Sequence, residues 1–190
     1  GAGLFERAAG LTPESHEPER ARRLLSAAEA HFRGGEPDRA RTLLETAAAG
    51  EGPLRFEALC RLGFLLDETV GGNSSLQVFE RALGTADPSV ASEAHRGLAQ
   101  SLSYVGGLDR ALEHAGAAVR VAEPLAGRST LVYALAMQAL VRRIVGDPDW
   151  RRPLDRGLAL ESTVELPELD GCPSAFEADI RRLALELDPA

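Results

Sequence analysis

The chain has 190 residues and a formal net charge of −8, and Ala, Leu and Arg contribute 31, 29 and 21 residues. All 21 basic residues are Arg, so chemistry that needs a Lys ammonium is excluded: the GxxxxGK[ST] phosphate loop, the pyridoxal Schiff base and Ser-Lys catalysis. The acidic balance and the lack of a basic stripe argue against direct nucleic-acid contact by this segment.

The first predicted elements are a short helix over 4–10 and a linker over 11–18. We therefore expect an N-terminal helix and linker over 1–18, followed by helical repeats over 19–190. No charged segment followed by an apolar core marks a secretory signal. The longest mostly apolar run, 131–141, is far shorter than the roughly 20 residues of a membrane span. These features predict a cytoplasmic protein without membrane contact, and the first residue, Gly rather than Met, suggests a fragment of a longer chain.

Four stretches of the chain can be laid over one another, at 21–53, 56–88, 92–124 and 131–162. Each has an apolar-periodic first helix, a turn with Gly or Asp, and a second helix. The anchor positions of the second helices step by 35, 36 and 39 residues and are Ala47, Ala82, Ala118 and Gly157. Small residues at one equivalent site of the first helices let paired helices approach closely, and these are Ala28, Gly63 and Ala99. The pattern predicts an all-α, right-handed solenoid of antiparallel helix hairpins.

The turns and ends of these units carry their own signals. One Gly or Gly pair punctuates each hairpin turn, which predicts a positive φ, at 34–35, 71–72, 106–107 and 146. Asp38, Asp109 and Asp149 lie near the starts of second helices and are candidate caps. Ser74 and Ser75 are interpreted as a turn leading into a helix cap. After a loop over 165–173, Ser174 is predicted to cap a helix to about 187, with an apolar stripe at Phe176, Ile180, Leu183 and Leu187. This helix is the first half of a fifth unit.

No catalytic constellation accompanies this architecture. The four His residues have no metal-ligand spacing, and His31, His95 and His114 fall at helix positions where a structural role is favoured. Cys60 and Cys172 are far apart, and Cys60 lies among apolar residues as a small buried side chain. We therefore predict a non-enzymatic segment with no cofactor and no metal ion.

The first helices are expected to line the concave wall of the solenoid. A wall with aromatic side chains beside Arg and Glu suits a peptide, a partner helix or a small polar ligand. The alternative, held equally open, is that the polar side chains are only solvated and the aromatic rings pack against neighbouring helices. The candidate ligand- or partner-binding residues are Glu29, Arg33, Phe64, Arg96, Gln100, Tyr104 and Arg142.

The repeat resembles the tetratricopeptide repeat, whose usual unit has about 34 residues. The third stretch fits it best, with Leu98-Ala99, Gly106, Asp109-Arg110-Ala111, Ala118 and Pro124. The fourth departs from it, with Pro153 inside the first turn of its second helix.

Longer runs are more specific. LFERAAGLTP (4–13) and ERARRLLSAAEAHFRGGEPDRARTLLETA (19–47) are similar to the helical-repeat region of large LuxR-type, MalT-like transcriptional regulators. Such proteins join a nucleotide-binding ATPase, a tetratricopeptide-like region and a C-terminal helix-turn-helix. The resemblance implies a sensor and scaffold segment that receives a small-molecule inducer or a protein partner and couples it to other domains of a longer parent chain. The alternative is a free-standing tetratricopeptide adaptor for protein–protein interaction.

Overall fold

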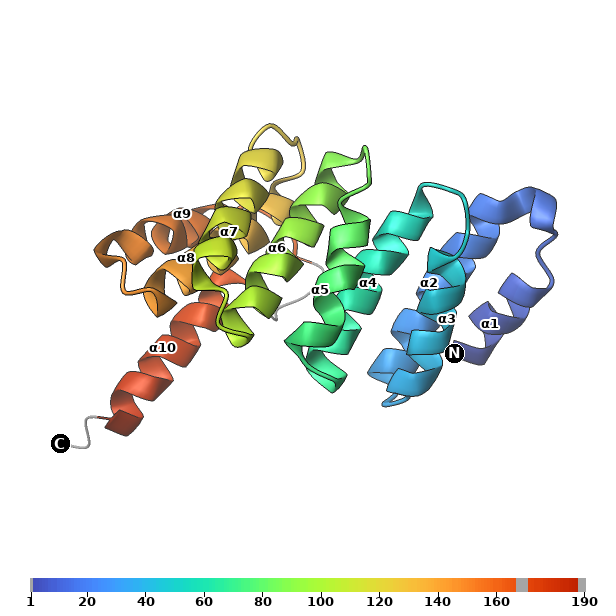
Figure 1. Cartoon of the computed structure of the whole chain (residues 1–190), viewed down its shortest axis with the longest axis horizontal. Coiled ribbons are helices and arrows are strands. Elements are labelled where there is room, and N and C mark those ends of the chain that lie inside the picture. The colour runs from blue at the N-terminus through green and yellow to red at the C-terminus, as the bar shows by residue number, and fades with distance from the viewer. Residues whose placement is uncertain (1, 167–170, 188–190) are drawn as a thin grey trace. The chain divides into compact units, whose positions relative to one another are not determined.

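The computed structural model describes residues 2–166 and 171–187, and these residues form α-helices and short 3-10 helices, with no strand in either range. The helices divide into two compact groups, residues 1–86 and 87–190, which we call the N-terminal and C-terminal groups. The predicted all-α fold of antiparallel helix hairpins is confirmed (Figure 1). The N-terminal group holds α1 (Ala2–Gly10), the 3-10 helix η1 (Glu14–His16), α2 (Glu17–Arg33), α3 (Pro37–Ala48), α4 (Leu54–Thr69) and α5 (Gly72–Ala82).

The C-terminal group repeats the same plan. Its helices are α6 (Pro88–Tyr104), α7 (Leu108–Ala122), α8 (Arg128–Ile144), the 3-10 helix η2 (Pro148–Trp150), α9 (Arg151–Glu161) and α10 (Pro173–Leu187). Helices α2 and α3, α4 and α5, α6 and α7, and α8 and α9 pack as hairpins. The first helices also contact each other within a group, α2 with α4 and α6 with α8. Helix α10 packs on α8 and α9, as the first helix of a further unit would.

The predicted anchor positions form the cores of the hairpins. Ala47, Ala82 and Ala118 are buried, and so is Gly157 of the fourth unit. Two paired helices approach closely at Gly63, where a Cβ atom would fall 2.6 Å from two ring carbons of the fully buried Phe79. Only Gly lets α4 and α5 lie at this separation, which explains why the second unit carries it.

The hairpin turns confirm the prediction of one left-handed glycine each. Gly35, Gly71, Gly106 and Gly146 have φ values of 79°, 113°, 85° and 76°. In this region a side chain would be strained, because its Cβ approaches the backbone, so Gly is the residue that ends the first helix and redirects the chain.

The predicted caps are wrong. Asp38 and Asp109 lie inside the first turn of α3 and α7, and neither helix start has a side-chain cap hydrogen bond. Asp149 lies within η2 and donates its own N–H to Asp147, 2.9 Å away. Asp87, which accepts from Ser89 N and Val90 N, and Asp147 do cap helix starts. Both precede a Pro that begins the next helix, where its missing N–H costs no hydrogen bond.

Ser75 is also not a cap, since it lies within α5 and is fully buried. Its hydroxyl is in hydrogen-bond contact with the carboxylate of Asp67 on α4 and lies 2.8 Å from the carbonyl oxygen of Gly72. Ser75 therefore supplies a hydrogen-bond donor to a buried carboxylate across the hairpin.

The N-terminal helix packs directly on the repeats. Arg23 of α2 donates from Nη1 to the carbonyl oxygen of Ala8 at 3.0 Å and to Thr12 Oγ1 at 2.6 Å, and so holds the end of α1. Helix α2 begins at Glu17, inside the segment predicted as linker, because Pro18 occupies the helix start, where its fixed φ suits the first turn. The domain boundary at residue 18 stays a prediction.

Helix α10 is fixed at its start by a side chain from another helix. Glu161, the last residue of α9, accepts from Ser174 N at 2.9 Å and from Ser174 Oγ at 2.5 Å. The prediction that Ser174 caps α10 is therefore wrong, because the carboxylate of Glu161 supplies the acceptor and Ser174 lies inside the helix. Phe176 and Ile180 of the predicted stripe are half-buried, whereas the side chains of Leu183 and Leu187 lie outside the described residues.

Candidate partner-binding surface

We call the solvent-facing sides of α2 and α4, and of α6 and α8, the first-helix faces of the two groups. On the face of the N-terminal group an ion-pair row crosses between the two helices. Arg61 of α4 pairs with Glu57 at 2.7 Å and with Glu29 of α2 at 3.3 Å, and Glu29 pairs with Arg33 at 2.6 Å. All four side chains are partly exposed, so each pair stabilises the fold by less than about 1 kcal/mol and stays available for exchange with a partner's charges.

Phe64 has a different environment from Glu29 and Arg33. It is half-buried on α4, and its ring packs edge-on against Phe79 of α5 with the ring centroids 4.9 Å apart. Most of the ring therefore serves the hairpin, and only its exposed portion can meet a partner. Of the three predicted residues in this group, the structure brings Glu29 and Arg33 into contact.

On the first-helix face of the C-terminal group, Arg96, Gln100 and Tyr104 form one stripe along α6, because they are spaced four residues apart. Arg96 is half-buried, with its guanidinium carbon 5.6 Å from the centroid of the Tyr133 ring on α8. Gln100 is half-buried, and Tyr104, at the end of the helix, is 67% exposed. The stripe therefore presents cationic, amide and aromatic groups in sequence.

Gly171, which precedes α10, also lies near this stripe. A Cβ atom on Gly171 would lie 3.9 Å from Nη1 of Arg96, which places the chain's own backbone beside the guanidinium. The end of the stripe at Tyr104 is the more open one, because the Tyr104 side chain is largely exposed.

Arg142 lies in the last turn of α8. Its Nε lies 3.7 Å from the Asp147 carboxylate, and its carbonyl oxygen accepts from Asp147 N at 2.9 Å. Arg142 thus helps to hold the turn between α8 and η2, and its side chain is only partly exposed to solvent.

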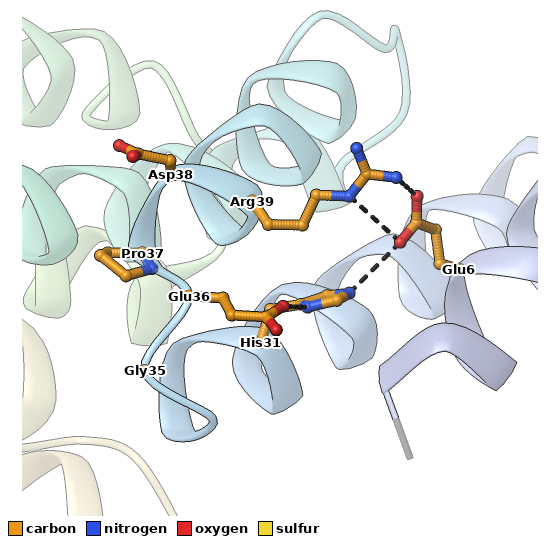
Figure 2. A pocket seen from close by; sticks show the side chains of 7 residues that line it. All are labelled: Glu6, His31, Gly35, Glu36, Pro37, Asp38 and Arg39. Carbon is orange, nitrogen blue, oxygen red and sulfur yellow. Dashed lines mark hydrogen bonds and ion pairs between the residues drawn. The ribbon is translucent and has the colours of Figure 1, made fainter.

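One polar cluster was not predicted from the sequence, a shallow depression of about 550 Å³ between α1, α2 and α3 (Figure 2). Glu6 of α1 pairs with Arg39 of α3 and lies 3.2 Å from Nε2 of His31, whose Nδ1 is 2.5 Å from Glu36. Hydrogen bonding from Arg39, aided by its charge and by His31, holds the pKa of Glu6 below its usual value. Glu6 and Arg39 are 33 residues apart, and no motif links them, so only the packing of α1 reveals the cluster.

His31 and His95 lie at helix-packing positions, as predicted. No group of three or more His, Cys, Asp or Glu side chains within 2–166 and 171–187 is arranged to hold a metal ion. None of the helices searched in the described part of the chain is long and apolar enough to cross a membrane.

Comparison with known proteins identifies the fold. No family model and no curated protein matches the chain. A solved structure of the nearly identical TPR-like repeats of a Podosopora anserina protein assigned as a kinesin light chain matches 85% of this chain and 86% of that one, with a TM-score of 0.61 and 17% identity. YrrB, a TPR protein with an unusual peptide-binding site, matches over 84% of this chain and 79% of its own, with a TM-score of 0.56 and 16% identity.

MamA from Desulfovibrio magneticus RS-1, from residue 41 to its end, gives a TM-score of 0.57 at 16% identity, over 86% of this chain and 97% of that one. The predicted tetratricopeptide-like fold is therefore confirmed, and at these identities the likeness extends to the fold alone.

Proposed function

We propose that this chain is a non-enzymatic protein-interaction scaffold that binds a partner on its first-helix faces. The observation that carries the proposal is the stripe of Arg96, Gln100 and Tyr104 on α6, because it offers charge, amide and aromatic groups at helical spacing beside Tyr133. Such a stripe suits an extended or helical peptide, which binds through side-chain pockets and hydrogen bonds. The peptide-binding site of YrrB, a protein of similar fold, supports this choice.

The wider setting that we propose is the sensor and scaffold segment of a LuxR-type regulator, in which the partner is a protein or a small-molecule inducer. The similarity of the runs at 4–13 and 19–47 to such regulators supports it. A cytoplasmic location, without direct contact to nucleic acid or membrane, belongs to the same proposal. A free-standing adaptor for protein–protein interaction is the second candidate, favoured by the same stripe without the parent domains.

The proposal is tested with a photo-crosslinking amino acid at position 100 of the full chain, with crosslinked proteins identified by mass spectrometry. The double variant Arg96→Ala plus Tyr104→Ala should lose the crosslinked partner, because both side chains flank Gln100 on α6. The matched control is Arg110→Ala plus Leu112→Ala on α7, the other helix of the same hairpin.

Loss of the partner in the first double variant, with retention in the control, supports binding on the first-helix face. Equal retention in both, or equal loss in both, contradicts it. The sequence of the parent gene distinguishes the regulator from the free-standing adaptor. A Walker-type loop upstream and a helix-turn-helix downstream support the regulator, and their absence supports the adaptor.

A further inference from the structure

Two His side chains face each other across one hairpin of the C-terminal group. Nδ1 of His95 on α6 lies 2.9 Å from Nδ1 of His114 on α7, and the ring centroids are 5.1 Å apart. The centroid separation exceeds the N–N distance by nearly two ring radii, so the two Nδ1 atoms point at each other. This is the geometry of an N–H···N hydrogen bond.

Such a bond needs one donor and one acceptor. A neutral imidazole carries one N–H and one lone pair, whereas an imidazolium carries two N–H groups and no acceptor. The pair can therefore keep its hydrogen bond when both rings are neutral or when one is protonated. When both are protonated, two N–H groups and two positive charges face each other at contact distance, and the bond is lost.

The surroundings add to this effect. Arg120, also on α7, is a further positive charge that acts on His95. The side chains of Arg120 and of Gln138 on α8 both lie close to Gly116, so α8 contributes a neutral amide there. Burial, followed by the charges of His114 and Arg120, lowers the pKa of His95. The site thus disfavours the second proton on three counts.

A metal ion does not fit the same arrangement. Two ligand nitrogens must direct their lone pairs at a common third point about 2.0–2.1 Å away. Here the nitrogens are directed at each other, which is the arrangement for a shared proton.

We propose that the His95–His114 pair is an acid-sensitive latch between α6 and α7, which is closed while the two rings share a proton and weakens when both rings are protonated. Arg96 is the next residue after His95 on α6, so loosening the hairpin displaces the stripe of Arg96, Gln100 and Tyr104. The effect of the latch on partner binding rests on the proposed function, whereas the latch itself does not.

The direction of the pH effect follows from proton counting. The unfolded chain takes up a proton on each ring below a pH of about 6.5, whereas the closed pair takes up only one. Stability is therefore greatest above this pH and falls as the pH falls. The unfolding equilibrium constant should rise by up to about tenfold for each pH unit below 6.5 through this pair.

The experiment is urea unfolding of the full chain between pH 7.5 and 5, followed by the fluorescence of Trp150, the single Trp, which lies in the C-terminal group. His114→Gln should reduce the pair's pH dependence, because the amide cannot be charged, while burial and Arg120 still act on His95. His16→Gln, which alters a ring in the N-terminal group, far from the pair in sequence, is the matched control and should follow the wild type.

A second measurement uses only the wild type, so it holds even where a variant fails to fold. In a titration of ¹⁵N-labelled His followed by NMR, one ring of the pair should remain neutral well below a pH of about 6.5. The latch is contradicted if both rings are protonated near a pH of about 6.5, or if His114→Gln keeps the full pH dependence of the wild type. Neither result bears on binding at the stripe, which the Arg96 and Tyr104 variants test separately.

Discussion

Replacing Gly63 with Ala tests whether α4 and α5 pack so closely that only a hydrogen atom fits as the side chain at position 63. The added Cβ would lie 2.6 Å from Cε1 and Cζ of Phe79 and 2.9 Å from Cδ1. Phe79 is fully buried and packs edge-on against Phe64, so its ring cannot move away without disturbing the core. Either the ring leaves its rotamer or the two helices separate.

The expected magnitude follows from two opposing effects. Overpacking a core costs about 1–3 kcal/mol, and a contact this short against a rigid ring belongs at the upper end of that range. Removing Gly from a helix interior gains about 0.5–1 kcal/mol. We therefore expect Gly63→Ala to lower the free energy of unfolding by about 2 kcal/mol.

The assay is urea unfolding followed by far-UV circular dichroism. Gly116→Ala is the matched control, because its Cβ would meet the flexible end of Arg120 at 3.1 Å. That variant should be unchanged or more stable by up to about 1 kcal/mol. Gly63→Ala combined with Phe79→Leu should be less destabilised than the two single effects predict together, because the smaller side chain makes room. A Gly63→Ala variant at least as stable as the wild type would refute the reasoning.

Three further predictions concern helix ends and the α1 cluster. Asp87→Ala should cost about 1 kcal/mol of unfolding free energy through loss of the α6 cap, whereas Asp109→Ala, which removes no cap, should cost clearly less in the same urea assay. Glu161→Ala should speed amide hydrogen exchange at the start of α10 because Ser174 N loses its acceptor, and unchanged exchange would contradict this role. The lowered pKa of Glu6 means that its stabilising effect is full above the unfolded pKa of about 4.3 and is lost as the pH falls through the lower folded pKa. Arg39→Gln should therefore flatten the wild-type loss of stability between about pH 5 and 3, and an unaltered profile would count against the pairing.

The repeat plan was predictable because close helix packing restricts residue size at fixed intervals. Ala47, Ala82, Ala118 and Gly157 revealed the register even where the step was longer. Turn glycines were predictable for a similar reason, since a left-handed residue at the end of a helix strongly favours Gly.

The helix caps were predicted wrongly because a cap depends on the helix start to within one residue. The useful signal was Asp directly before Pro, as in Asp87-Pro88 and Asp147-Pro148, rather than Asp near the turn.

The candidate site was predictable only along single helices. The spacing of Arg96, Gln100 and Tyr104 on one stripe follows from helix geometry alone. Contacts between segments far apart in sequence cannot be derived from helix geometry. The pairing of Glu6 with Arg39 and the approach of Gly171 to Arg96 were therefore found only in the structure. Phe64 illustrates the same limit, because its packing on Phe79 depends on how closely α4 and α5 approach.

The pattern of helix contacts has a kinetic consequence. Within each group, and over the described residues, every packed pair of α-helices joins elements that are neighbours or next neighbours along the chain. Contacts between residues close in sequence require little loop closure, and proteins rich in them fold in microseconds to milliseconds. During synthesis, α2 can therefore pack against α3 as soon as both have left the ribosome. Within the same group, the hairpin of α4 and α5 then adds to a surface that is already folded.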